Sequence, residues 1–144
     1  MEYTYKQLYR EYNLKLADPT AEVINRPDKI VEIAQTGFTP IQEIMTLYVL
    51  NTKNAIVEEF EVARGNYNTL SITPREIFIH VLRSGCSRFI ISHNHPSGNP
   101  DPSDEDIQFT RKVKQGAEIL GLQILDHIIV TADNSYSFKQ GRLL

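Results

Sequence analysis

The residues best suited to chemistry lie in the segment SHNHPSGNPDPSDED, residues 92–106, where two histidines one residue apart precede a loop rich in proline. Successive side chains of an extended chain point to opposite faces, so His93 and His95 share one face. Two imidazoles at a strand end are a common start for a zinc site, and a third ligand from a carboxylate leaves the fourth position open for water. Four acidic residues are candidates for that third ligand: Asp101, Asp104, Glu105 and Asp106.

The same segment has a simpler explanation as a polar loop before a helix. Ser103 and Asp106 form an S-x-x-D helix start, and acidic side chains near a helix N-terminus are stabilised without any metal. His80 and His127, each isolated in the sequence, are typical of ordinary side chains. The combination of a buried strand, His-x-His, a Pro/Gly loop and a capped helix favours the metal site, because strand ends and helix starts form ligand sites in α/β proteins.

Hydrophobic periodicity and helix-start and helix-stop residues predict one mixed α/β layer structure around this segment. The predicted helices cover residues 28–37, 39–43, 73–85 and 103–121, and the predicted strands cover residues 44–51, 54–65, 87–92, 122–131 and 137–139. A turn and a short extended piece are expected within residues 65–72. The first residues are polar with scattered tyrosines, so we expect an N-terminal arm over residues 1–25 and one domain over residues 26–144.

Simple alternation of side chains predicts which residues of two strands share a face. In the strand over residues 54–65, the residues on one face are Ile56, Glu58, Phe60 and Val62. Asp126 and His127 interrupt the apolar run LQILDHIIV, where alternation groups one of them with Ile124 and Ile128, and the other with Leu125 and Ile129. Buried polar groups need partners, so these two residues are interpreted as a satisfied core pair, with proximity to the metal loop as the alternative.

Composition excludes several classes of protein. The 144 residues are 41% apolar and 23% charged, which fits one globular domain. No apolar run is long enough to span a bilayer and no signal peptide is evident, so we expect a cytoplasmic protein without membrane contact. Cys86 is the single cysteine, which excludes an internal disulfide and a multi-cysteine zinc site. The net charge is −3 without a basic tract, so any DNA binding should be weak and independent of base sequence.

The segment HNHPSGNPDPSDED resembles the signature of the JAMM (MPN+) metalloproteases, in which His-x-His is followed by proline and then by Ser-x-x-Asp. Together with TPREIF and LDHIIV it is similar to the RadC-like bacterial branch of that family, over about residues 38–140. The resemblance implies a single mixed-sheet α/β domain of the JAB/MPN type, with the layer architecture of cytidine deaminases. It also implies one Zn²⁺ held by His93, His95 and Asp106, with Ser103 at the position of the family's serine.

Larger RadC proteins, historically labelled as DNA repair proteins, begin with a helix-hairpin-helix region. The expected arm over residues 1–25 has no room for such a region. This difference weakens the transfer of a DNA role to this chain.

The resemblance further implies that a zinc-activated water hydrolyses a peptide or isopeptide bond of an unknown peptide or protein substrate. Such a reaction needs a carboxylate outside the ligand set as general base and a hydroxyl group near the developing oxyanion. Glu43 is our candidate for the base because it precedes an early strand, as the catalytic glutamate of JAMM proteins does; a solvated acid is its simpler explanation. Glu76 is the competing candidate, although a capping box with Thr73 already explains it. Ser103 fits the oxyanion role as well as the helix cap.

Two other functions compete with this hydrolase. A non-catalytic MPN-fold binding module, associated with DNA repair or DNA-processing proteins, has the same fold, but such modules lack metal ligands and here the set is complete. A deaminase-type zinc enzyme takes ligands from a C-x-x-C pair, which a chain with Cys86 alone does not contain. The sequence specifies neither the substrate nor the oligomeric state.

Overall fold

The structure, a computed structural model, describes residues 20–65 and 72–144. Its elements are α2 (Pro27–Thr36), β1 (Glu43–Leu50), β2 (Ile56–Gly65), α3 (Pro74–Ser84), β3 (Arg88–Asn94), α4 (Asp104–Leu120), β4 (Gln123–Val130) and β5 (Ser135–Ser137). This is the predicted order, apart from the short helix expected at residues 39–43. The arm expected over residues 1–25 lies mainly outside the described residues, as does the extended piece expected within residues 65–72.

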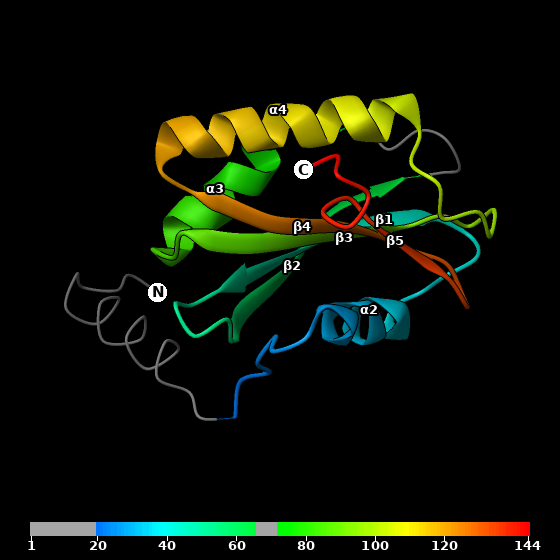
Figure 1. Cartoon of the computed structure of the whole chain (residues 1–144), viewed down its shortest axis with the longest axis horizontal. Coiled ribbons are helices and arrows are strands. Elements are labelled where there is room, and N and C mark those ends of the chain that lie inside the picture. The colour runs from blue at the N-terminus through cyan, green and yellow to red at the C-terminus, as the bar shows by residue number, and fades with distance from the viewer. Residues whose placement is uncertain (1–19, 66–71) are drawn as a thin grey trace, which may run out of the picture.

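One five-stranded mixed sheet forms the middle layer, with the strand order β2-β1-β3-β4-β5 (Figure 1). β1 pairs antiparallel with both β2 and β3, whereas β3 and β4 are parallel and are connected through α4. α3 and α4 cover one face of this sheet, and α2 covers the other. The mixed-sheet α/β domain predicted from the sequence is therefore confirmed.

Two apolar cores hold the three layers together, one on each face of the sheet. Beneath α3 and α4, the fully buried side chains include Leu47, Val49, Ile77, Val81, Phe89, Ile91 and Val113. On the other face, the side chains packed together include Ile30, Ala34, Tyr48, Leu50, Ile90 and Ile128. Because side chains alternate along β3, His93 follows Phe89 and Ile91 on the face that α3 and α4 cover.

β2 departs from the alternation predicted for residues 54–65. Two register shifts interrupt its pairing with β1. As a result, Ile56 packs against the core beneath α2, whereas Phe60 and Val62 pack against the core beneath α3 and α4. The predicted common face for these three side chains is wrong, because each extra residue in a strand reverses the phase of the side chains that follow.

The helix predicted at residues 39–43 does not form, and this segment enters β1 as a bend. Asn94 of β3 holds it in place. Its Nδ2 donates to two carbonyl oxygens of the segment, including that of Thr39 at 2.8 Å, and its Oδ1 accepts the Ile44 N–H at 2.7 Å. In a helix, the Thr39 carbonyl would accept a hydrogen bond from the backbone N–H of Glu43. Here Glu43 is instead the first residue of β1.

α3 begins and ends where the sequence predicts. Pro74 lies in its first turn, and the Glu76 carboxylate accepts the Thr73 N–H at 3.0 Å, completing the capping box. Gly85 ends the helix with a φ of 72°, and Gly121 ends α4 in the same left-handed conformation. Among residues 20–65 and 72–144, no helix has both the length and the apolar composition of a membrane span.

A register shift in β4 determines which face of the sheet His127 occupies. Pairing with β3 skips Leu125, so that His127 pairs with Ile91 and faces the α4 side. Ile124 packs beneath α4, whereas Leu125 and Ile128 pack on the α2 side. The predicted groupings of Ile124 with Ile128, and of Leu125 with His127, are therefore wrong, again because an extra residue changes the alternation.

The last strand, β5, is Ser135–Ser137 and begins two residues before the predicted strand at 137–139. The Asp126 side chain connects β4 to the end of β5 and to the residues that follow β5. One oxygen of its carboxylate accepts the N–H groups of His127 at 2.7 Å and Lys139 at 3.0 Å, and the other accepts the Ser137 hydroxyl. Asp126 and His127 are thus both satisfied, as expected, but through different partners rather than as a side-chain pair.

We predict that Asp126→Asn folds with a free energy of unfolding close to that of the wild type at neutral pH. Burial raises the pKa of Asp126, which means that burial opposes its charge, so a neutral amide of the same shape loses little, and the asparagine oxygen still accepts the same N–H groups. Asp126→Ala removes the acceptor and should cost about 1–3 kcal/mol. Urea unfolding of both variants tests this, and equal destabilisation would contradict the role assigned to Asp126.

Candidate metal centre

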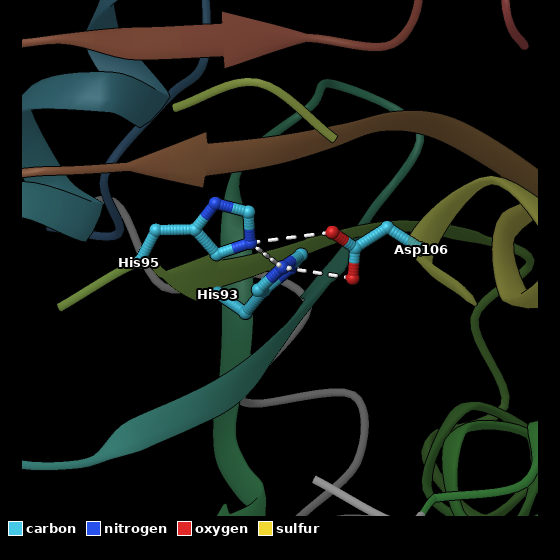
Figure 2. Close-up of side chains that lie close together, drawn as sticks. All are labelled: His93, His95 and Asp106. Carbon is cyan, nitrogen blue, oxygen red and sulfur yellow. Dashed lines mark hydrogen bonds and ion pairs between the residues drawn. The ribbon is translucent and has the colours of Figure 1, made fainter. Parts of the chain in front are cut away.

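Three side chains that can bind a metal converge where β3 ends and α4 begins (Figure 2). The Nε2 atoms of His93 and His95 lie 3.0 Å apart, and each lies 3.2 Å from an oxygen of Asp106. Of the four candidate carboxylates, Asp106 is the one that joins the two histidines. The side chains of His93, His95 and Asp106 are 1%, 13% and 18% exposed, so the group is anchored inside but open on one side.

The two histidines owe their position to the end of β3. His95 lies one residue beyond the strand, and its N–H donates to the Val130 carbonyl at 2.9 Å, which continues the pairing with β4. The extended backbone therefore persists through His95, and both imidazoles point to one face as predicted. In the loop that follows, the Asn99 carbonyl oxygen lies 2.9 Å from the His95 Nδ1. This carbonyl can only accept, so it fixes the proton on Nδ1 and leaves Nε2 free for a metal.

Asp106 is placed by the first turn of α4. The Ser103 hydroxyl accepts the Asp106 N–H at 3.1 Å, and the Asp106 carboxylate accepts the Ser103 N–H at 2.9 Å. This capping box is the simpler explanation that the sequence offers for both residues. It is compatible with a metal site, since the same Asp106 carboxylate also reaches the two histidines.

The group is electrostatically polarised in a way that suits a cation. Burial alone raises the pKa of Asp106, but hydrogen bonds with His93 and His95 outweigh it and hold that pKa far below its usual range. For His95, burial lowers the pKa, but the hydrogen bond with Asp106 and that with the Asn99 carbonyl raise it. Positive charge therefore stabilises this cluster, and a divalent ion can take the place of the protons.

The donor set fits zinc. A tetrahedral ion with bonds of about 2.0–2.1 Å to nitrogen places its ligand atoms about 3.3 Å apart. The two Nε2 atoms, 3.0 Å apart, are close to that separation, and each lies 3.2 Å from a different oxygen of Asp106, so either oxygen can complete the ligand set. Two imidazoles and one carboxylate also form a ligand set known for catalytic zinc, which retains an open fourth position.

Beside the three side chains lies a cavity of about 650 Å³. Its polar lining comes from several elements and includes Glu43, Thr73, His95, Asn99, Ser103 and Asp106. Its apolar lining includes Met45, Ile72, Pro74 and Phe109. The open side of the candidate metal centre thus faces a volume that a ligand can enter.

The model of the RadC-like JAB domain family matches residues 24–143, which contain every residue of this site. The chain belongs to the RadC-like JAB domain family. The resemblance inferred from the HNHPSGNPDPSDED segment is confirmed.

Relatives of this JAB domain occur in several bacteria. A UPF0758 protein of Clostridium botulinum (strain Eklund 17B / Type B) is 37% identical over 137 residues, covering 95% of this chain and 56% of the relative. UPF0758 proteins of Carboxydothermus hydrogenoformans and Enterococcus faecalis are 46% and 43% identical over 107 and 95 residues, covering 74% and 66% of this chain, and 47% and 40% of the relatives. The chain thus spans about half the length of these relatives, whose names state no reaction.

In this JAB domain the two candidate general bases lie in different environments. Glu43 lines the cavity, close enough to His95 for its charge to raise the pKa of that imidazole. The register of β1 explains this position, because Met45 lies opposite His93. Glu76 lies in the first turn of α3, where its hydrogen bonds to Thr73 lower its pKa. The geometry therefore brings Glu43, rather than Glu76, to the candidate metal centre.

Two further residues lie near the site: Asn94, which the sequence does not point to, and His127, for which the sequence gives proximity to the metal loop only as an alternative. His127 lies directly behind His93, with its Nε2 2.7 Å from the His93 Nδ1. Complete burial lowers the pKa of His127 well below its ordinary value, which favours the neutral ring. Asn94, between the two histidines, points to the opposite face and holds the segment that precedes Glu43. A polar residue inside an apolar run was the signal for His127; only the fold reveals the contacts of Asn94.

We predict that Ser103→Ala lowers the free energy of unfolding of the metal-free protein by about 1 kcal/mol, because it removes the N-cap acceptor of α4. Ser103→Thr keeps a hydroxyl at the cap and should stay within a few tenths of a kcal/mol of the wild type. Chemical denaturation in the presence of a chelator measures both. If alanine proved as stable as threonine, the hydrogen bond from the Asp106 N–H would not contribute to the helix start.

Proposed function

We propose that this chain is a zinc-dependent metallopeptidase or isopeptidase-like hydrolase of the JAMM type. The observation that carries the proposal is the convergence of His93, His95 and Asp106 at the edge of a cavity that Glu43 also lines. A binding module has no need of two imidazoles, a carboxylate and a further acid around one opening. The substrate is proposed to be a peptide or protein, since the chemistry of this site suits an amide carbonyl.

The roles of the residues follow from their chemistry and position. His93, His95 and Asp106 would hold the ion, which when bound acts as a Lewis acid and lowers the pKa of a water ligand to about 7. Glu43 would accept the proton of the attacking water and return it to the leaving amine, as a general base that then acts as an acid. The Ser103 hydroxyl, exposed at the cavity, would donate to the carbonyl oxygen as negative charge develops on it.

A single serine can serve both as helix cap and as oxyanion donor. The Asp106 N–H donates to a lone pair of the Ser103 oxygen, and this bond does not use the hydroxyl proton. That proton remains available to a group inside the cavity, which Ser103 lines. The cap would then fix the direction in which the hydroxyl can donate.

We predict that the purified protein binds about one Zn²⁺ per chain, and that His95→Ala and Asp106→Asn reduce this to a small fraction, because each removes a ligand. Inductively coupled plasma mass spectrometry after gentle purification measures the metal, and reloading of apoprotein tests its return. Zinc should also raise the thermal midpoint, since a ligand bound only by the folded state stabilises it. A folded wild-type protein that cannot be loaded would exclude the proposed hydrolase and favour the non-catalytic module.

We predict that Glu43→Gln retains zinc but loses about 100-fold or more of the hydrolytic rate, because the amide cannot accept the proton of the water. Glu76→Gln is the matched control, and should keep activity with a modest loss of helix stability of up to about 1 kcal/mol. Cleavage of a pooled peptide library, with and without chelator and read by mass spectrometry, supplies the assay. Full activity in Glu43→Gln, together with an inactive zinc-loaded Glu76→Gln, would exchange the two roles.

A further inference from the structure

A continuous line of buried hydrogen bonds runs behind the candidate metal centre, from His93 of β3 to α4. The His93 Nδ1 lies 2.7 Å from the His127 Nε2, and the His127 Nδ1 lies 2.6 Å from the Thr110 hydroxyl. That hydroxyl lies 2.7 Å from the backbone carbonyl oxygen of Asp106. The line therefore begins at one candidate ligand and ends at another.

The last acceptor of the line, the Asp106 carbonyl oxygen, determines the direction of these hydrogen bonds. The Asp106 carbonyl can only accept, so the Thr110 hydroxyl must donate to it. Thr110 then accepts from the His127 Nδ1–H, and a neutral imidazole protonated on Nδ1 has an unprotonated Nε2. His127 must therefore accept the proton on His93 Nδ1. In this arrangement all three contacts have a proton, one each from His93, His127 and Thr110.

The opposite direction leaves one contact without a proton. If Thr110 donated to His127, nothing would lie between its oxygen and the Asp106 carbonyl oxygen, which are 2.7 Å apart. Two acceptors at that distance in a buried site repel each other. His127 and Thr110 are both 0% exposed, so water cannot compensate for the missing bond. Among the described residues, no buried side-chain nitrogen or oxygen lacks a partner.

We propose that Thr110 and His127 are positioning residues that keep the proton of His93 on Nδ1 and its Nε2 lone pair directed at the metal, in register with Asp106. The proposal rests on the metal centre of the proposed function, but not on the reaction or its substrate. It assigns roles to a hydroxyl in the second turn of α4 and to a histidine of β4 that contact neither the ion nor a substrate.

The surroundings of His127 restrain its ring in the required orientation. Phe138 stacks on it with the ring centroids 4.5 Å apart and an angle of 8° between the planes. The Phe138 N–H also donates to the His127 carbonyl at 3.0 Å, which holds the two residues together. The register shift at Leu125 turns the ring toward His93 and Thr110 rather than toward α2. Sheet geometry and ring stacking thus both support the same hydrogen-bonded orientation.

The line also couples two ligands that lie on different elements. His93 is at the end of β3 and Asp106 is in the first turn of α4, and the 17-residue helix separates β3 from β4 in sequence. Thr110 bonds the carbonyl of the residue four positions earlier, a normal back-bond in a helix. By also accepting from His127, it fixes the rotation of α4 relative to the imidazole of His93. Partners of this kind commonly change metal affinity 10–100-fold when they are removed.

The test compares Thr110→Val with Thr110→Ser. Valine has nearly the same shape as threonine but no hydroxyl, whereas serine keeps the hydroxyl and loses one methyl group. Zinc affinity is measured by competition with a chromophoric chelator, with folding checked by circular dichroism under the same conditions. We expect Thr110→Val to bind zinc about tenfold more weakly than Thr110→Ser, because His127 then has no acceptor for its Nδ1–H. Equal zinc affinities in the two folded variants would overturn the proposal.

A second measurement uses the wild-type protein and so does not depend on how the variants fold. Long-range ¹H–¹⁵N correlation spectra of the imidazoles identify which nitrogen of His127 carries the proton, in the metal-free and in the zinc-loaded protein. The proposal predicts the Nδ1–H tautomer of His127 in both. An Nε2–H tautomer in either form would overturn it. A protein that binds no zinc but shows the Nδ1–H tautomer would refute the proposed function while leaving the hydrogen-bonded line intact.

Discussion

The carboxylate of Asp106 lies 3.2 Å from both the His93 and the His95 Nε2 atoms, and the rest of the site depends on this contact between β3 and α4. It requires a strand that stays extended through His95 and a helix that starts at Ser103. The parallel β3–α4–β4 unit satisfies both conditions, since the carboxyl end of a strand and the N-terminus of the next helix meet at one edge of the sheet. The capping box and the buried pairing with β4 then hold the two ends together.

Around this contact, each layer of the fold positions a different part of the site. β1 contributes Glu43 from the strand next to β3, because antiparallel pairing places the start of β1 beside the end of β3. The opposite face carries Asn94, whose side chain holds the segment that enters β1. The core beneath α3 and α4 buries the histidine-bearing face of β3 up to His93. A cation bound at the edge of this core would meet an open cavity on one side and buried hydrogen bonds on the other.

Much of this was predictable from local sequence signals. Ser103 and Asp106 predict the start of α4, while Thr73, Pro74 and Glu76 predict that of α3, because caps act within one turn of the chain. The His-x-His spacing predicts a common face from the geometry of an extended chain alone.

The predictions that proved wrong concern segments whose conformation depends on partners distant in sequence. The bulges in β2 and β4 depend on how neighbouring strands pair, so the alternation of side chains could not reveal them. The segment over residues 39–43 has the cap and proline of a helix start, yet the amide of Asn94, about fifty residues later, takes over its hydrogen bonds. The sequence favours a core histidine at position 127, with proximity to the metal loop as the alternative. His127 is a core residue by burial, but its contact with His93 is visible only once β4 lies beside β3.

The measurement that tests the central claim most directly is a crystal structure of the zinc-loaded protein, with anomalous diffraction data collected on both sides of the zinc edge. The account predicts one anomalous peak about 2.0–2.2 Å from the His93 Nε2, the His95 Nε2 and an Asp106 oxygen, with the fourth position facing the cavity that Glu43 lines. Zinc bound elsewhere, or a fourth protein ligand closing the coordination sphere, would contradict it.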